Sequence, residues 1–177
     1  MYTFLIIFII LLLSLFIYYF YLLNLNKKIN KIEINIQKLL QNRADTIPGL
    51  YEISKEYLIK HSKVFEEAIK LRKLQFSLNE YSVSFIEFIK NEIAINHEFS
   101  FIFSICTKNK KLSEIKKFKY IKKLIIEKNQ KIGIEIENYK KTISLLNNLI
   151  IIKNYTVLGF ALPLGKRIES DLIKNIF

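Results

Sequence analysis

The first 26 residues contain no charged side chain, and this stretch constrains the fold more than any other part of the chain. Between Phe4 and Leu23 nearly every residue is Leu, Ile, Phe or Tyr. A helix of about 20 apolar residues, at about 1.5 Å per residue, spans the roughly 30 Å hydrocarbon core of a bilayer. The sequence therefore predicts a transmembrane anchor over residues 1–26, with the lipid bilayer as its partner.

A cleavable signal peptide is the main alternative to an anchor. Such a peptide starts with Lys or Arg, has a shorter apolar core and ends at small residues that form the cleavage site. Here no Lys or Arg precedes the apolar run, and the run ends in Tyr18-Tyr19-Phe20-Tyr21. Because tyrosines gather at membrane–water interfaces, this cluster favours an uncleaved span.

The charges that flank the anchor predict its orientation. Lys27, Lys28, Lys31 and Lys38 follow the apolar run, and no lysine or arginine precedes it. The positive-inside rule then places the N-terminus outside and the rest of the chain in the cytoplasm. The chain is rich in lysine throughout, so any flanking segment would look basic. We predict a single-pass protein of this topology.

Apolar residues after the anchor recur at spacings of three and four, which is the pattern of a helix that packs on partner helices. The pattern begins inside the apolar run and continues beyond it, through Leu22, Leu25, Ile29, Ile32, Ile36 and Leu39. Pro48 disfavours a helical conformation at Ile47, so this first helix is expected to end near Ala44. The anchor and the first helix of the following domain are therefore predicted to be one continuous helix.

The remaining chain also has helical patterning. Asp45-Thr46 before Pro48 predicts a capped helix start, because Asp and Thr side chains cap helices and Pro suits the first turn. With only four Gly and two Pro in 177 residues, long helices are expected. We predict an all-α fold in which the transmembrane helix continues into an antiparallel four-helix bundle with a short C-terminal helix. The bundle domain is residues 27–177, with helices at about 27–44, 48–78, 80–106, 111–152 and 164–176.

A basic stretch extends from Lys108 to Lys131. It contains ten lysines, and its only acidic residues are Glu114 and Glu127. It could attract anionic lipid headgroups, at about 1 kcal/mol per lysine near the surface, or the phosphates of nucleic acid. The competing interpretation is a solvated helix face. Nucleic acid is the less favoured ligand because arginine, which reads base edges, is nearly absent. The candidate anion-binding face consists of Lys108, Lys110, Lys111, Lys116, Lys117, Lys119, Lys122 and Lys123.

Residue patterns that support catalysis are missing from the sequence. It has no Gly-rich phosphate loop, no HExxH and no Cys-x-x-Cys. Neither His61 nor His97 has a Glu three residues before it, as a di-iron bundle would require. Cys106 is the single cysteine, so it forms no intrachain disulfide, and no base is marked as its catalytic partner. We predict no catalytic residues, no metal and no cofactor.

The segment from Gln41 to Tyr57, QNRADTIPGLYEISKEY, resembles the LemA family, which carries Arg-x-Asp-x-Ile-Pro-x-Leu after an N-terminal membrane helix. Gly49 departs from this pattern, because the family usually has Asn there. The residues that match the family, in this segment and later in the chain, are Arg43, Asp45, Ile47, Pro48, Leu50, Glu52, Lys55, Tyr57, Ile132, Tyr139, Asn147, Gly159 and Phe160. The resemblance implies a bacterial helical bundle anchored in the cytoplasmic (inner) membrane with its N-terminus outside, and no established activity.

Three functions remain open at this point. The favoured one is a non-enzymatic scaffold, or partner-binding module, whose protein partners the sequence does not reveal. The second is binding of anionic lipid through the Lys108–Lys131 face, and the third is a homo-oligomer formed through the first helix. Arg43 and Asp45 flank the first bend, so we expect them to brace it through a charged hydrogen bond or a cap. This is a structural role rather than a ligand site.

Overall fold

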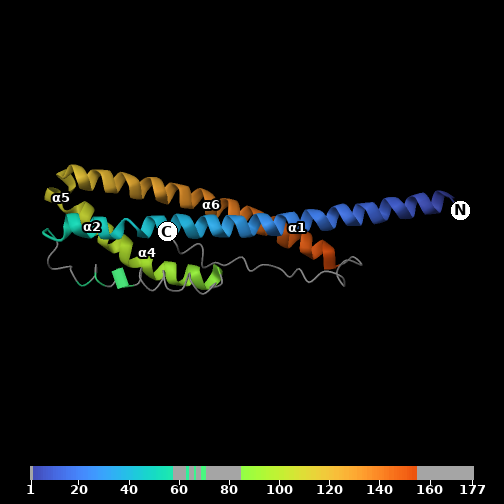
Figure 1. The fold of residues 1–177 in the computed structure, drawn as a ribbon, viewed down its shortest axis with the longest axis horizontal. Coiled ribbons are helices and arrows are strands. Elements are labelled where there is room, and N and C mark those ends of the chain that lie inside the picture. Colours follow the sequence, from blue (N-terminus) through green and yellow to red (C-terminus); the bar gives the residue numbers. More distant parts are fainter. Residues whose placement is uncertain (1, 58–62, 64–65, 67–68, 71–84, 155–177) are drawn as a thin grey trace. The chain divides into compact units, whose positions relative to one another are not determined.

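A computed structural model of the chain describes residues 2–57, 63, 66, 69–70 and 85–154 (Figure 1). Within these residues the chain is helical, with short turns and no strand. The helices are α1 (Tyr2–Ala44), α2 (Ile47–Ser54), α4 (Phe85–Lys108), α5 (Lys110–Glu114) and α6 (Lys116–Asn154). The expectation of an all-helical chain with an apolar N-terminal helix is therefore confirmed.

The chain divides into two compact units. Unit 1 comprises Met1–Ile34 and Glu137–Glu169, and unit 2 comprises Asn35–Ile136 and Ser170–Phe177. Helices α1 and α6 each contribute to both units, because the divisions fall inside them.

The described part of unit 1 is an antiparallel pair of helices. The Tyr18 hydroxyl of α1 donates to the Leu149 carbonyl of α6, and the Tyr139 hydroxyl of α6 donates to the Glu33 carboxylate at 3.1 Å. Higher residue numbers on α1 thus meet lower numbers on α6. The buried side chains that these two helices contribute to unit 1 are Leu22, Leu25, Ile29, Ile32, Tyr139, Thr142, Ile143, Leu146 and Ile150.

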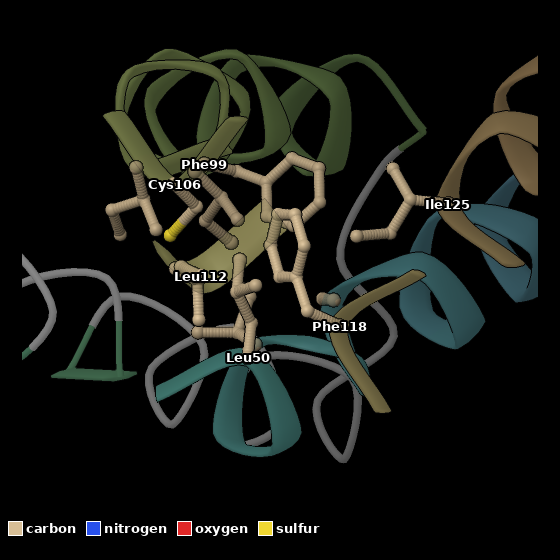
Figure 2. Close-up of a cluster of buried hydrophobic side chains, with 10 residues drawn as sticks. Leu50, Phe99, Cys106, Leu112, Phe118 and Ile125 are labelled. Carbon is tan, nitrogen blue, oxygen red and sulfur yellow. The ribbon is translucent and has the colours of Figure 1, made fainter. Parts of the chain in front are cut away.

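Unit 2 is built around an apolar cluster to which α1, α2, α4, α5 and α6 all contribute. Figure 2 shows Phe99 of α4 and Phe118 of α6 pointing toward a common centre with Leu50 and Leu112, and the sulfur of Cys106 lies beside them. The full cluster consists of Ala44, Ile47, Leu50, Ile95, Phe99, Ile102, Cys106, Leu112, Phe118 and Ile125. The burial of such side chains is the main stabilising term in a helical domain.

The first part of α1 is not covered by the rest of the protein. The large apolar side chains from Tyr2 to Leu13 are about half exposed or more, whereas Leu22 and Ile29 are fully buried. Within the described residues, one helical stretch, Tyr2–Ser54, is long and apolar enough to cross a membrane, and its most apolar window is 6% buried. A core helix would be mostly buried, and this apolar window of α1 is not, although a signal sequence can be equally long and apolar.

The buried face of α1 differs from the prediction at one position. Leu40 is fully buried, and Leu39 is only half-buried. The step from Ile36 to Leu40 is four residues instead of three, so the buried face continues through Arg43 to Ile47. The predicted end of the first helix near Ala44 is confirmed.

The helix predicted for residues 48–78 is interrupted. Helix α2 ends at Ser54, and the amide of Tyr57 donates to the Ser54 carbonyl at 2.9 Å, which closes a turn. The Ser54 hydroxyl donates to the Leu50 carbonyl at 2.6 Å, a local bond of the kind that weakens helix continuation. Pro48 lies in the first turn, as predicted. Thr46 does not cap α2, because its hydroxyl donates to the Arg43 carbonyl at the end of α1.

The helix predicted for residues 111–152 is also broken, at Ile115, whose backbone is extended (φ −66°, ψ 126°). Residues six apart on one continuous helix point about 120° away from each other. The break lets both Leu112 and Phe118 enter the same apolar cluster, with exposures of 0% and 1%. The Asn109 side chain accepts from the Leu112 amide at 3.1 Å and so caps α5. Burial of two side chains therefore outweighs helix continuity here.

Some of the sequence predictions concern residues that the structure does not describe. The short helix predicted for residues 164–176 lies outside the described residues, as do His61, Gly159 and Phe160.

Candidate functional site

Arg43 lies at the end of α1 and points into unit 2. It comes three residues after Leu40, so helical geometry places it on the buried face, and its side chain is 2% exposed. Its Nη2 atom donates to Oε1 of Glu92 at 2.9 Å. The two residues form an ion pair between α1 and α4 that is closed to solvent, since the Glu92 side chain is 0% exposed.

A third polar side chain, Asn129 of α6, meets this pair. Arg43 Nη1 donates to Asn129 Oδ1 at 3.3 Å, and the guanidinium carbon of Arg43 lies 5.6 Å from the centre of the Phe99 ring. We call Arg43, Glu92 and Asn129 the polar triad. It connects three helices that are distant in sequence, so its geometry fixes how their faces align within unit 2.

Burial and pairing act on Arg43 in opposite directions. Burial lowers the pKa of the guanidinium below its usual value, and the charge and hydrogen bond of Glu92 oppose this change. A buried ion pair costs desolvation that the pairing must offset, so its net contribution to stability is small. The loss of one partner is costly because the other charge is left buried alone. The ion pair therefore acts mainly by favouring one alignment of the helices that it joins.

The other residues of the Arg-x-Asp-x-Ile-Pro-x-Leu segment occupy different environments. Ile47 and Leu50 are fully buried in the apolar cluster. Asp45 is exposed, and Tyr57 is 39% exposed. The charged hydrogen bond expected of Arg43 is present, but it reaches α4 instead of closing the bend locally.

Tyr139 and Asn147 belong to unit 1, not to the polar triad. Tyr139 is 5% exposed and bonds Glu33, while Asn147 is half-buried. Of these two residues, Tyr139 therefore connects α6 to α1.

Gly49 explains part of the close packing of α2. A Cβ atom at this position would lie 3.3 Å from Cδ1 of Ile121 on α6. The Asn that the family usually carries here would need Ile121 to move. In this chain Gly49 allows α2 to approach α6 more closely.

The predicted anion-binding face lies at the end of α4, on α5 and on the first turns of α6. Lys122 is half-buried, and the other lysines are exposed. Within the described residues, Lys123 pairs loosely with Glu127 at 3.9 Å, and no ion pair is found for the other seven. The exposed lysines are Lys108, Lys110, Lys111, Lys116, Lys117, Lys119 and Lys123.

The remaining candidate reactive groups are dispersed. Burial raises the pKa of the Cys106 thiol to about 11, and a hydrogen bond with Ser54 opposes this only in part. His97 has an 83% exposed side chain beside Glu98. No group of three or more His, Cys, Asp and Glu side chains that could hold a metal is found among the described residues.

Sequence reasoning did not single out Glu92, although the sequence contains a signal for it. Glu92 lies four residues after Phe88 and three before Ile95, so it occupies a position on the apolar face of α4. Arg43 and Asn129 likewise interrupt the apolar faces of α1 and α6. Polar residues on the apolar faces of three helices predict a buried polar contact. Which of these residues contact each other is visible only in the structure.

These features define an all-helical protein with a long apolar N-terminal helix and a buried Arg–Glu pair in its helical core. The model of the LemA family matches residues 32–154, which include the polar triad and the Arg43–Leu50 segment. The chain belongs to the LemA family. No curated protein and no solved structure matches the chain. Family membership and the apolar N-terminal helix are compatible with a membrane-anchored protein.

Proposed function

We propose that this chain is a single-pass protein of the bacterial cytoplasmic membrane. In this proposal the N-terminus lies outside, and the helices after residue 26 form a non-enzymatic scaffold in the cytoplasm that binds protein partners. The observation that carries the proposal is the continuity of α1. One helix has exposed large apolar side chains between Tyr2 and Ile17 and a buried face from Leu22 onward. Such a helix couples a membrane segment to a packed module without a flexible linker.

An antiparallel four-helix bundle is part of the proposal. Helix α4 runs in the same direction as α1 and α2, because Arg43 bonds Glu92, and the later Ser54 lies beside the later Cys106. Helix α6 runs in the opposite direction within unit 2, since Arg43 meets Asn129 and the later Gly49 lies against Ile121. These directions are those of the first, third and fourth helices of an up-down bundle.

Topology is tested with single cysteines in a Cys106→Ala background. Thr3→Cys and Lys90→Cys place thiols at exposed positions on α1 and α4. A membrane-impermeant maleimide applied to intact cells should label position 3 only, and position 90 should react after lysis. The reverse pattern would overturn the orientation. Release of the chain by alkaline carbonate would overturn the anchor itself.

Partner binding is tested by photo-cross-linking in cells. A benzophenone amino acid at Tyr120, which is 66% exposed, samples the basic face, and one at Phe101, which is 47% exposed, samples α4. A partner-binding module predicts a discrete adduct from one position and not from the other. An adduct of two copies of this chain would identify the homo-oligomer, and the absence of adducts at a series of exposed positions would contradict the scaffold.

The exposed lysines of the predicted anion-binding face favour a second candidate function, the binding of anionic lipid. The test uses the full chain in nanodiscs of phosphatidylglycerol or phosphatidylcholine, with lysine acetylation read by mass spectrometry. Lipid binding predicts protection of Lys116, Lys117 and Lys119 in the anionic discs at low salt and loss of protection at high salt. The exposed Lys90 is the control. Equal acetylation in both discs would remove this candidate, and protection by added RNA alone would indicate nucleic acid.

A further inference from the structure

The two helices of unit 1 meet inside the apolar segment of α1. The Tyr18 hydroxyl donates to the Leu149 carbonyl, and Tyr18 lies five residues before the end of the apolar run at Leu23. A tyrosine at the membrane–water interface keeps its ring in an apolar environment and directs its hydroxyl to a hydrogen-bond partner. Helix α6 supplies that acceptor, and it therefore extends alongside residues that the proposed anchor places at the membrane.

Both helices lose their charges over the same interval. On α1 the uncharged run ends at Asn26, and Lys27 is the first charge. On α6 the stretch Thr142–Ile152 has no charge, and it lies between Lys141 and Lys153. Lys27 and Lys141 both lie between the Tyr139–Glu33 contact and the Tyr18–Leu149 contact. The boundary between charged and uncharged surface is thus shared by the pair.

The outer surface of this uncharged part of α6 is apolar in places. Ile143, Leu146 and Ile150 are at most 1% exposed, whereas Leu145 and Ile151 are 42% and 41% exposed. On α1, Phe20 and Tyr21 are each 47% exposed over the same interval. All four side chains belong to unit 1, as does the apolar segment of α1.

We propose that residues 142–152 of α6 lie in the interfacial layer of the bilayer, where lipid covers Leu145 and Ile151. This inference rests on the proposed transmembrane role of α1. Eleven residues make about 16 Å of helix, which is too short to cross a membrane. Ser144 and Asn148 are exposed in the same stretch, so it suits the interface and not the hydrocarbon centre. The anchor then enters lipid as a pair of helices and not as a single one.

The test is spin-label accessibility of the full chain reconstituted in liposomes. Single cysteines at Ile10, Lys141, Leu145 and Ile151, each in the Cys106→Ala background, carry a nitroxide label. Collisions with oxygen, which concentrates in lipid, are compared with collisions with a water-soluble nickel complex. Ile10 reports the anchor and Lys141 reports the charged side of the boundary, and circular dichroism confirms that every variant is helical.

We expect the oxygen-to-nickel collision ratio to be several-fold higher at positions 145 and 151 than at 141, and highest at 10. If 10 is lipid-exposed while 145 and 151 match 141, the interfacial placement of α6 is wrong and the anchor stands. If 10 is itself accessible to nickel, the anchor is wrong, and this inference fails with it.

Discussion

Nη2 of Arg43 lies 2.9 Å from Oε1 of Glu92, in the interior of unit 2, although the two residues are 49 positions apart in sequence. The exposed fraction of each side chain is at most 2%. The Arg of the family segment therefore does not present a charge to a ligand. It joins the end of α1 to α4 and, through Asn129, to α6.

Removal of one member of the pair should be strongly destabilising. Arg43→Ala leaves the Glu92 carboxylate buried without its cation, and breaking such a pair costs about 3–5 kcal/mol. The measurement is thermal or denaturant unfolding of the full chain in detergent. The double variant Arg43→Met/Glu92→Leu is the control, because it removes both charges and keeps the volume, and it should be more stable than Arg43→Ala. If the single variant were as stable as the wild type, the pair would carry no structural role.

Tyr139→Phe tests the second polar contact. It deletes the hydroxyl that donates to Glu33 at 3.1 Å and keeps the ring, which is 5% exposed. A hydrogen bond to a charged group contributes about 1.5–3 kcal/mol, and the half-buried carboxylate places this bond at the lower end of that range. Tyr120→Phe, at a 66% exposed position, should leave the unfolding free energy unchanged. Equal effects of the two substitutions would rule out the contact.

The Cys106 thiol should report the opening of the apolar cluster. Its pKa is raised to about 11 by burial, and its side chain is 0% exposed, so a thiol reagent at pH 8 should react only when unit 2 opens. Modification should therefore be slow in the folded chain and fast in denaturant. Rapid labelling of the folded protein at pH 8 would contradict the burial of Cys106.

The same pKa predicts a pH dependence of stability. The unfolded thiol ionises from its ordinary pKa of about 8.5 upward, while the folded thiol stays protonated to about 11. The unfolded state then binds fewer protons than the folded state over this pH range. The contribution of the thiol to the unfolding free energy is therefore fully present below pH 8 and falls as the pH rises toward 11. Other groups titrate here as well, so the readout is the difference from Cys106→Ala. Parallel pH profiles of the two proteins would refute the prediction.

Gly133→Ala should stabilise the chain. A Cβ atom at Gly133 meets no atom within 4 Å, and the residue lies inside α6, where Ala is favoured over Gly by about 1 kcal/mol. The expected result is an increase of about 0.5–1 kcal/mol in the unfolding free energy. Gly49→Ala is the matched comparison, because its Cβ would lie 3.3 Å from Ile121 and part of the gain would be lost. A larger gain at Gly49 than at Gly133 would contradict the packing of α2 on α6.

Much of the helical pattern could be predicted from residue spacing. The apolar face of the first helix through Leu22, Leu25, Ile29, Ile32 and Ile36 was expected from the sequence, and all five side chains are buried. Spacing failed at Ser54 and at Ile115, where the chain leaves the helix. At Ile115 the reason is tertiary, because the break brings Leu112 and Phe118 into the same cluster. No periodicity within one helix contains that information.

The sequence by itself determined the uncharged N-terminal segment, the helical class and the family, because charge, spacing and the Arg-x-Asp-x-Ile-Pro-x-Leu segment are local properties. Only the tertiary structure decided the partners of Arg43. Glu92 and Asn129 lie 49 and 86 residues away from it, and the contacts depend on how the faces of three helices align. The same holds for Tyr18 and Leu149, which are 131 residues apart. Pairing across such distances is set by burial of the opposing faces and by the need to satisfy each polar group that is buried with them.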